Sequence, residues 1–379
     1  MEKFFNNNRL LLTSTKPITL NRFLYPICEK LDKEFDLEIF IGSRDVKTLN
    51  SKWSKYKSFE INYPKSWKDL LNPINFLKII IKINKLINTN KIKYIYVHTP
   101  IASHLMRIAK IFNFRRKPII IFQVHGFRFY GKTLSIGKLI FFLIELFLCI
   151  VSTNYIITIN RFDYVISKIF KPFSKKNIFF VKGVGVESSK LKPYLKKKKD
   201  TDLSKVVGVV ATYNKEKGYE TILNVAKELS EYKFKCFGAG SYSYYKAKAE
   251  NKKIFNIQFN NFTEKIEEEI SNFHVMFLPS QREGLNVSVQ EALFLGIPVV
   301  TSNIRGCKDI LEGSEINFIF NENDITTASS LLRHILSLDL QAYNEIRMKC
   351  LRHAYNNYDS TIITKKYITI FKRILLPSE

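Results

Sequence analysis

Short apolar runs and longer amphipathic stretches alternate along almost the whole chain, and this alternation constrains the fold more than any other feature. Runs rich in Ile, Val, Phe and Tyr are typical of buried strands, and the stretches between them carry apolar residues at helical spacing. Strands that alternate with helices predict a parallel sheet covered by helices. In the first half we expect strands at 10–12, 37–41, 94–97, 119–123 and 155–159, and helices at 23–35, 73–88, 101–112, 137–152 and 161–170.

The alternation starts again after a short interruption, which predicts a second domain of the same α/β class. The glycine-rich residues 183–186 and the lysine run 196–199 mark the boundary, because a block of like charges resists packing. The second half opens with a strand at 206–211, and an apolar-periodic segment ends the chain at 360–376. We therefore predict two Rossmann-like domains, at 1–190 and 200–358, followed by a helix at 359–379.

The stretch 279–301 is the most informative part of the second half. A short apolar strand at 275–278 precedes it, a helix is expected to start near Leu285, and another strand follows. Such a loop lies at the carboxyl end of a parallel sheet, where ligands bind, and the amide groups at the start of the helix favour a phosphate. A carboxylate in the loop and another on the helix could accept hydrogen bonds from hydroxyl groups on either side of that phosphate. The expected ligand contacts are Glu283, Gly284, Leu285, Asn286 and Glu291.

A second candidate phosphate site is the turn 212–218, which follows a strand and precedes a helix. Lys217 could neutralise a diphosphate, and Gly218 lets the start of the helix pack closely. Gly238 and Gly240 follow the next strand, in a glycine pair of the kind that is common in turns.

Candidate residues in the first half cluster around histidines. His125 lies between an apolar strand and Gly126, where backbone can approach a ligand closely. His98 directly follows another strand, and Arg128 and Tyr130 are further candidates on the loop after His125. The other four histidines are expected to be structural or solvated.

The positive charge is concentrated in the first half of the chain. Residues 1–200 hold 38 Lys and Arg against 13 Asp and Glu, a net +25, whereas residues 201–379 hold 22 against 21, a net +1. Codon bias toward lysine would act on both halves, so the asymmetry indicates an anionic partner, either nucleic acid or an acidic membrane surface. Each basic side chain near an anionic leaflet contributes on the order of 1 kcal/mol to membrane binding.

Two apolar segments bear on membrane contact. Residues 139–151 are too few to span a bilayer, which takes about 20 residues, so we expect a core helix or a partly embedded face. Residues 74–87 read equally well as a surface helix or as a basic amphipathic helix lying on a membrane, with Leu77, Ile80, Ile81, Asn84 and Ile87 on one side. The five cysteines are scattered and odd in number, and the N-terminus lacks a signal-peptide pattern, so we expect a reducing compartment.

Several segments together resemble the family 4 retaining glycosyltransferases, whose signature is two glutamates separated by seven residues, as in Glu283 and Glu291. The resemblance runs in order from about residue 10 to about residue 375. The subgroup it is most similar to builds capsules, O-antigens and glycans on undecaprenyl diphosphate, and includes N-acetylgalactosaminyltransferases. The other matching segments are 97–102 (Val-His-Thr-Pro-Ile-Ala), 124–130 (Val-His-Gly-Phe-Arg-Phe-Tyr), 158–164, 183–186 and 303–306.

The resemblance implies a GT-B fold, in which two Rossmann-like domains face each other and the C-terminal helix crosses back to the first domain. The first domain would bind the acceptor, on a side that Arg128 and Tyr130 shape. The second would bind the nucleotide sugar, with Gly238 and Gly240 beside the base. Glu283 would position the sugar hydroxyls, Glu291 would bind the ribose, and His125 would contact the donor sugar near its reacting carbon. The family carries an arginine where this chain has Thr212, with Arg282 and Arg305 as candidate replacements.

The resemblance also implies a reaction that retains the anomeric configuration, in which the leaving phosphate takes the proton of the acceptor hydroxyl. Lys217, arginine and the helix dipole supply the positive charge, so we expect no metal ion and no cofactor. The predicted function is transfer of a hexose or N-acetylhexosamine from a UDP-sugar to a lipid-linked glycan, peripherally on the inner face of the cytoplasmic membrane.

Two alternatives stay open at this point. A nucleotide-sugar epimerase shares the fold but has no use for a basic first half. A basic nucleic-acid-binding protein would explain the charge, but no nucleic-acid motif is recognisable and the charge is dispersed among apolar helices, so no nucleic acid is expected as a partner.

Overall fold

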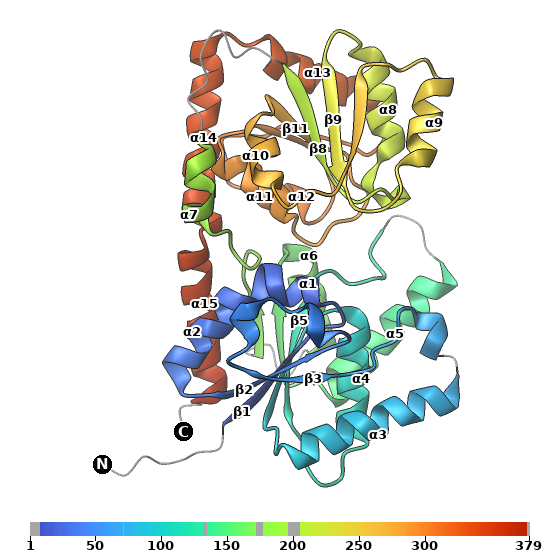
Figure 1. Ribbon diagram of the computed structural model, residues 1–379, viewed down its shortest axis with the longest axis vertical. Coiled ribbons are helices and arrows are strands. Elements are labelled where there is room, and N and C mark those ends of the chain that lie inside the picture. The colour runs from blue at the N-terminus through green and yellow to red at the C-terminus, as the bar shows by residue number, and fades with distance from the viewer. Residues whose placement is uncertain (1–7, 71, 132–134, 172–176, 196–204, 377–379) are drawn as a thin grey trace. The chain divides into compact units, whose positions relative to one another are not determined.

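The computed structural model describes residues 8–376 apart from 71, 132–134, 172–176 and 196–204. The chain forms two compact units, each with its own parallel sheet (Figure 1). The first unit joins Met1–Val184 to Thr364–Glu379, and the second is Gly185–Ile363. The chain therefore passes between the units twice, the second time inside helix α15 (Ser360–Leu375).

The first unit is built on a seven-stranded sheet in the order β3-β2-β1-β4-β5-β6-β7. All neighbouring strands are parallel, so all carboxyl ends lie at one edge. The sequence did not predict the two edge strands, β3 and β7. The strands are β1 (Arg9–Thr13), β2 (Glu38–Ser43), β3 (Lys57–Glu60), β4 (Tyr94–Val97), β5 (Ile119–Val124), β6 (Tyr155–Thr158) and β7 (Ile178–Phe180).

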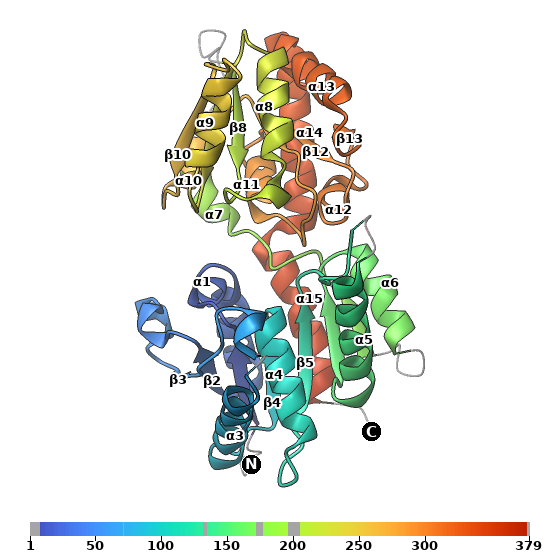
Figure 2. The ribbon, with the colours of Figure 1, turned by 90° about the vertical axis from the view of Figure 1, so that its right-hand side faces the viewer.

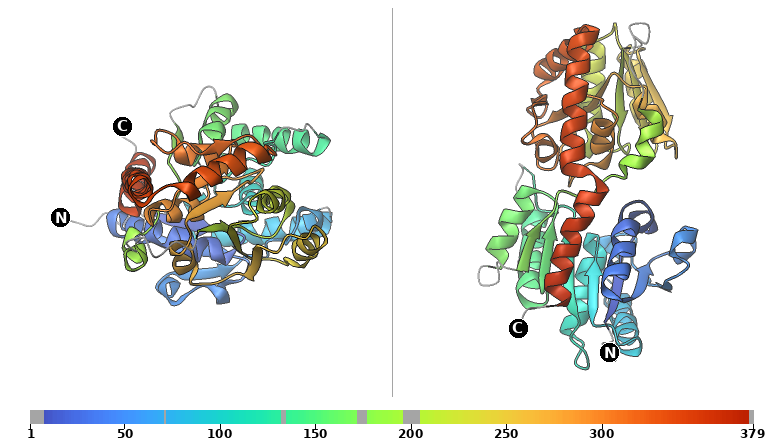
Figure 3. Two further views of the ribbon diagram at one scale, coloured as in Figure 1. Left: turned by 90° about the horizontal axis from the view of Figure 1, so that it is seen from above. Right: turned by 90° about the vertical axis from the view of Figure 1, so that its left-hand side faces the viewer.

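Helices cover both faces of this sheet (Figures 1 and 2). Right-handed crossovers place four of them on one face, where they pack on alternate strand residues such as Ile95 and Phe122. The opposite face receives α2 and α15 (Figure 3), and there Tyr96 contacts Phe371 with ring centroids 5.1 Å apart. The helices are α2 (Tyr25–Phe35) on the second face and α3 (Pro73–Thr89), α4 (Pro100–Ile111), α5 (Ile136–Val151) and α6 (Arg161–Phe170) on the first.

The second unit has a six-stranded parallel sheet in the order β10-β9-β8-β11-β12-β13. Its strands are β8 (Val206–Val210), β9 (Lys233–Gly238), β10 (Ile257–Asn261), β11 (Val275–Leu278), β12 (Val299–Ser302) and β13 (Ile319–Phe320). Its helices are α7 (Ser188–Leu191), α8 (Tyr219–Glu228), α9 (Ser243–Asn251), α10 (Ile266–Ser271), α11 (Val287–Phe294), α12 (Cys307–Leu311), α13 (Ile325–Ser337) and α14 (Leu340–Tyr358).

The predicted α/β class with two Rossmann-like domains is confirmed, as is the return of the C-terminal helix to the first domain. The hydroxyl of Tyr367, on α15, donates to the carbonyl of Gly183 at 3.0 Å, and also contacts the side chain of Gln123 on β5. Tyr367 is completely buried, so the end of the chain is part of the first unit's core.

Two helices of the first unit differ from the prediction. On α3 the buried side is Ile80, Ile83 and Ile87, whereas Leu77 and Ile81 are exposed. The helix is apolar on more than one side, so periodicity alone could not identify the inward one. The segment 139–151 is not an ordinary core helix, because α5 buries only Glu145, Leu148 and Cys149 and exposes most of its apolar residues. Within the described residues no helix is long and apolar enough to cross a membrane.

Candidate functional site

In the second unit the strand order reverses between β8 and β11, and the loops after these two strands lie side by side. The amide of Gln281 donates to the carbonyl of Glu216 at 2.8 Å. Gly218 has a φ of +72°, and a Cβ there would lie 2.0 Å from the carbonyl oxygen of Pro279. Only glycine allows this approach, which brings Lys217 to the loop of Glu283 at the point where open parallel sheets bind ligands.

Lys217 and Glu283 form an ion pair at this point. The Nζ of Lys217 lies 2.7 Å from Oε1 of Glu283, and the two side chains are 18% and 9% exposed. The same oxygen accepts hydrogen bonds from the hydroxyl of Ser280 at 2.9 Å and the side-chain amide of Asn286 at 3.2 Å. A carboxylate oxygen with three donors is held in one position and is a weak nucleophile.

Asn286 joins this cluster to helix α11. It is the N-cap residue, and its side-chain oxygen accepts from the amide of Val289 at 3.1 Å while its NH2 group contacts Glu283. The helix begins at Val287, close to the predicted start near Leu285, because the cap residue lies outside the helix. Glu291 follows one turn later and is 6% exposed.

The loop of Glu283 is also held from the side of β12. Gly306 has a φ of +78°, and a Cβ there would lie 2.2 Å from the carbonyl oxygen of Gly284. The hydroxyl of Ser302 donates to the carbonyl of Ser280. Contacts on both sides leave the loop little freedom, so the positions of Glu283 and Gly284 are set before any ligand binds.

The glycine pair after β9 borders the same edge of the sheet. A Cβ on Gly238 would lie 1.9 Å from the carbonyl oxygen of Ala211, so this site requires glycine. Gly240 has a φ of +98° and lies next to Tyr213, whose amide donates to the carbonyl of Ala239 at 2.9 Å. The two loops that were expected at the nucleotide are therefore in contact.

The two candidates for the arginine that Thr212 replaces differ in their surroundings. Arg282 is partly exposed and lies 3.2 Å from the carboxylate of Glu216, which is next to Lys217. Arg305 is buried at 2% exposure. Thr212 accepts a hydrogen bond from the side chain of Asn214 at 2.7 Å. Of the two, only Arg282 is open to solvent on a loop that contacts the turn of Lys217.

In the first unit the structure brings His98 and His125 together. His98 follows β4 and His125 follows β5, two adjacent strands, and Nδ1 of His98 lies 3.0 Å from Nε2 of His125. His98 is completely buried and His125 is partly buried. Burial lowers the pKa of both, to about 4 for His125, so both imidazoles are neutral near pH 7.

The surroundings of this pair decide which nitrogen carries the hydrogen. Within the described residues, the buried Nε2 of His98 has no hydrogen-bond partner. A buried N–H group without an acceptor is more costly than an unfilled lone pair. We therefore assign the hydrogen of His98 to Nδ1, which donates to Nε2 of His125. The hydrogen of His125 is then on its Nδ1, which makes that atom a donor.

Thr99 is a feature that the sequence analysis missed. It has a φ of +69°, which is rare for a β-branched residue, and it is the N-cap residue of α4. Its hydroxyl accepts from the amide of Thr15 at 3.1 Å and contacts the hydroxyl of Thr15 at 3.0 Å. These loops follow β1 and β4, where the strand order of the first sheet reverses. A strained threonine in that place is typical of functional sites.

The remaining candidates of the first unit, Arg128 and Tyr130, lie on the loop after β5, a few residues beyond His125. The guanidinium of Arg128 lies 5.3 Å from the ring centroid of Phe141 on α5. The ring of Tyr130 packs edge-on against Phe162 at 4.9 Å. The structure thus brings Lys217, Glu283 and Asn286 together in the second unit and His98 and His125 together in the first. Arg128 and Tyr130 contact Phe141 and Phe162 instead.

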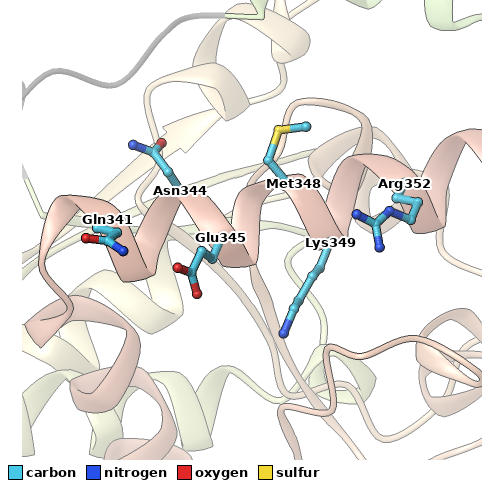
Figure 4. A pocket seen from close by; sticks show the side chains of 6 residues that line it. All are labelled: Gln341, Asn344, Glu345, Met348, Lys349 and Arg352. Carbon is cyan, nitrogen blue, oxygen red and sulfur yellow. The ribbon is translucent and has the colours of Figure 1, made fainter.

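The second unit also has a pocket that none of these residues lines (Figure 4). All six lining side chains come from helix α14 and lie along one side of it. A single helix provides no convergent polar groups, so we assign no function to this pocket. The lining residues are Gln341, Asn344, Glu345, Met348, Lys349 and Arg352.

No group of three or more His, Cys, Asp or Glu residues within the described ranges could hold a metal ion. The sequence contains one Asp-x-Asp triplet, the pattern with which metal-dependent sugar transferases hold their ion, at 200–202. It lies outside the described residues. The expectation of metal-independent transfer therefore rests on the positive charge of Lys217 and its neighbours.

Comparison with known families identifies the class of protein. Residues 192–356 match the family described as glycosyl transferases group 1, and residues 10–160 match the family described as glycosyl transferase 4-like. The two matches together span most of the chain, the first lying in the second Rossmann-like domain and the second in the first. The chain belongs to this family of glycosyltransferases.

Relatives and solved structures agree with this assignment. The capsular polysaccharide biosynthesis glycosyltransferase CapM of Staphylococcus aureus is 25% identical over 97% of both chains. An N,N'-diacetylbacillosaminyl-diphospho-undecaprenol alpha-1,3-N-acetylgalactosaminyltransferase of Campylobacter jejuni is 28% identical over 29% of each chain. The crystal structure of Anabaena Alr3699/HepE in complex with UDP and glucose has the same fold, with a TM-score of 0.73 at 14% identity over 96% of this chain and 99% of that one.

Proposed function

We propose that this glycosyltransferase retains the anomeric configuration, requires no metal, and moves a hexose or N-acetylhexosamine from a UDP-sugar to a lipid-linked glycan. The observation that carries the proposal is the pairing of Lys217 with Glu283 where the strand order of the second sheet reverses. A diphosphate attracts the lysine and a sugar hydroxyl donates to the carboxylate. In a bound sugar diphosphate, the phosphates would therefore replace Glu283 as the partner of Lys217, and the sugar hydroxyls would replace Lys217 as the partner of Glu283.

The surroundings of the pair support a role in leaving-group departure. As the glycosidic bond breaks, negative charge builds up on the diphosphate, and Lys217 and the first amides of α11 are positive groups that stabilise it. Glu283 then holds the sugar, and Glu291 binds the ribose. Because Oε1 of Glu283 already accepts three hydrogen bonds, it is a poor nucleophile. This supports attack by the acceptor on the face from which the diphosphate leaves.

The first unit would supply His125 to the donor sugar. With its hydrogen on Nδ1, His125 donates a hydrogen bond without carrying a charge, and its low pKa keeps it neutral. A neutral donor suits a carbonyl or hydroxyl oxygen of the sugar and does not compete with Lys217 for the diphosphate.

The names of relatives support the substrate classes. One acts in capsular polysaccharide biosynthesis and one transfers N-acetylgalactosamine to a diphospho-undecaprenol-linked sugar. UDP occupies the Anabaena protein. A lipid-linked acceptor and the net charge of +25 on residues 1–200 both favour a peripheral position on the inner face of the cytoplasmic membrane.

Calorimetric titration with UDP, GDP and ADP, without metal, tests this proposal. We expect selective binding of UDP by the wild type and weaker binding by the Glu291→Ala variant. Incubation with UDP-N-acetylhexosamines, with and without a lipid-linked acceptor, tests the reaction itself. Interconversion of the nucleotide sugars without acceptor would show an epimerase instead, and binding of nucleic acid but of no nucleotide would contradict the proposal.

A further inference from the structure

Helix α5 (Ile136–Val151) has its apolar side outward. Its exposed large apolar side chains lie at spacings of three and four residues along the whole helix and are between 36% and 80% exposed. They form one continuous face of four turns, which we call the α5 face. Its residues are Ile136, Leu139, Ile140, Leu143, Ile144, Phe147, Ile150 and Val151.

The inward side of the same helix carries its only carboxylate. Glu145 is 5% exposed, and its Oε2 lies 2.9 Å from Nη1 of the completely buried Arg107 on α4. Its other oxygen lies 3.3 Å from Nε2 of His104. The usual arrangement of a surface helix, with charge in water and apolar residues in the core, is reversed. The outward apolar side is therefore a defined feature of the fold, because the ion pair of Glu145 with Arg107 fixes which side of the helix faces inward.

The apolar surface continues beyond the helix. The adjacent α6 exposes Val165 and Ile169. The loop after α4 also exposes two phenylalanines, Phe112 at 56% and Phe114 at 88%. This loop lies at the end of α5, since Lys110 contacts the side chain of Asn154, just beyond that helix. An exposed apolar face as long as that of α5, with further exposed apolar residues on the adjacent elements, marks an interaction site.

The charge around the α5 face identifies its partner. Residues 70–144, which lead through α3 and α4 into α5, contain 13 Lys and Arg and not one Asp or Glu. Arg115, Arg116 and Lys117 are exposed directly beside Phe114. Helix α3, which packs against α4, exposes Ile74, Leu77 and Ile81 between the exposed Lys78, Lys82 and Lys85.

We propose that the α5 face is the surface by which this protein docks on an anionic lipid bilayer. The helix lies in the plane of the headgroups with its apolar residues among the acyl chains, and the cations beside it contact lipid phosphates. A second copy of the chain fits poorly, because a symmetric contact would bring two strongly cationic surfaces together. The inference rests on the proposed function in one respect: a lipid-linked acceptor is the reason for the enzyme to be at a membrane.

Vesicle binding tests the proposal. The wild type and a Leu143→Ser, Phe147→Ser variant are sedimented with vesicles of phosphatidylcholine alone and with added phosphatidylglycerol. Both substitutions are at exposed sites, so the fold is retained, which circular dichroism checks. We expect wild-type binding that rises with phosphatidylglycerol and falls with salt, and binding by the variant that is about tenfold weaker.

A matched control is Phe255→Ser, Phe262→Ser, which removes two exposed aromatic side chains from the second unit. It should bind vesicles like the wild type. Equal losses in control and variant, or equal binding by wild type and variant, would overturn the α5 face as the docking surface. A wild-type dimer that the α5 variant converts to a monomer in light scattering would overturn it in favour of a second copy.

A UDP titration of each variant separates this inference from the proposed function. Normal UDP binding with no vesicle binding by the wild type would overturn membrane docking while leaving the transferase proposal intact. Vesicle binding through α5 without UDP binding would support the docking surface and contradict the transferase proposal.

Discussion

At the scale of single residues, the function that we propose implies that donor binding begins by separating the ion pair of Lys217 and Glu283. In the structure each group neutralises the other at 2.7 Å. A bound diphosphate would form the ion pair with Lys217, and the carboxylate of Glu283 would accept hydrogen bonds from the sugar. Ser280 and Asn286 hold Glu283 in place during this exchange, since they contact the same oxygen.

Glu283→Gln should therefore reduce turnover by about a hundredfold or more, because an amide holds sugar hydroxyls and balances Lys217 less well than a carboxylate. Initial rates of sugar transfer at saturating donor measure this effect. Glu264→Gln, at an exposed position, is the control and should transfer normally. Near-normal turnover of Glu283→Gln with an unchanged melting temperature would rule out the role that we give to Glu283.

The histidine pair predicts how stability depends on pH. Burial lowers the pKa of His125 to about 4 in the folded state, against an ordinary value of about 6.5. The unfolded chain therefore binds a proton at higher pH than the folded chain does. The stability that the neutral imidazole contributes is complete above about pH 6.5 and is lost as the pH falls toward 4. For His125 alone this loss is at most about 3 kcal/mol.

Urea unfolding at a series of pH values between 7 and 4 checks this dependence. The wild type should lose stability across the window, and His125→Asn should lose less, because the variant has one fewer group that titrates differently in the two states. The difference between the two slopes isolates His125 from the acidic groups. Parallel slopes would show that His125 is protonated equally in both states.

At the scale of elements, α5 and α4 are locked together by a buried charge pair. Burial alone would raise the pKa of Glu145, but the charges of Arg107 and His104 outweigh burial and lower that pKa. The carboxylate is therefore ionised, and Arg107 has no exposure to solvent.

Glu145→Leu should destabilise the first unit by about 3–5 kcal/mol, because it leaves the buried guanidinium without its counter-charge. Removing both charges together, in Arg107→Met, Glu145→Leu, should recover most of this loss. Thermal unfolding of the two variants and the wild type measures both effects. If Glu145→Leu alone were as stable as the wild type, water or another group would have to compensate the charge of Arg107.

The sequence predicted the elements better than their orientations. Buried parallel strands such as Ile119–Val124 are continuous apolar runs and were predictable. The edge strands Lys57–Glu60 and Ile319–Phe320 were not, because they are short and one is mostly exposed. In α5, Glu145 interrupts an apolar run, and periodicity cannot show that a carboxylate turns inward when its partner, Arg107, lies on another helix.

The same limit applies to the candidate site. Motifs pointed to Lys217, Glu283, His98 and His125, because each follows a strand at the edge where ligands bind. The direct contacts between them were not predicted, since they depend on which strands are adjacent and on side-chain rotamers. Thr99 lies in a segment that matches the family, but nothing in the sequence indicates its positive φ, because that conformation comes from the packing around it.

At the scale of the whole molecule, the chain consists of two units that each have a sheet and a core. The residues that we propose for the nucleotide and its diphosphate, around Lys217 and Glu283, are in the second unit. The first unit is completed by the end of the chain, where Tyr367 is fully buried. Ligand binding and core mutations should therefore act on different units.

Differential scanning calorimetry tests this division. We expect two transitions, of which UDP at a hundred times its dissociation constant raises only the one that belongs to the second unit. The ligand stabilises that unit by about 2.7 kcal/mol, a shift of roughly 5 °C or more. Tyr367→Ala should lower only the other transition, since it removes a large side chain from the first core at a cost of about 3–5 kcal/mol.

The two perturbations are independent controls for each other. Applied together they should shift the two transitions in opposite directions, because UDP raises one while the substitution lowers the other. A single transition that responds to both would show that the units unfold as one cooperative body. In that case the stability lost through Tyr367 would also weaken the donor site, and the variant would bind UDP less tightly near its melting temperature.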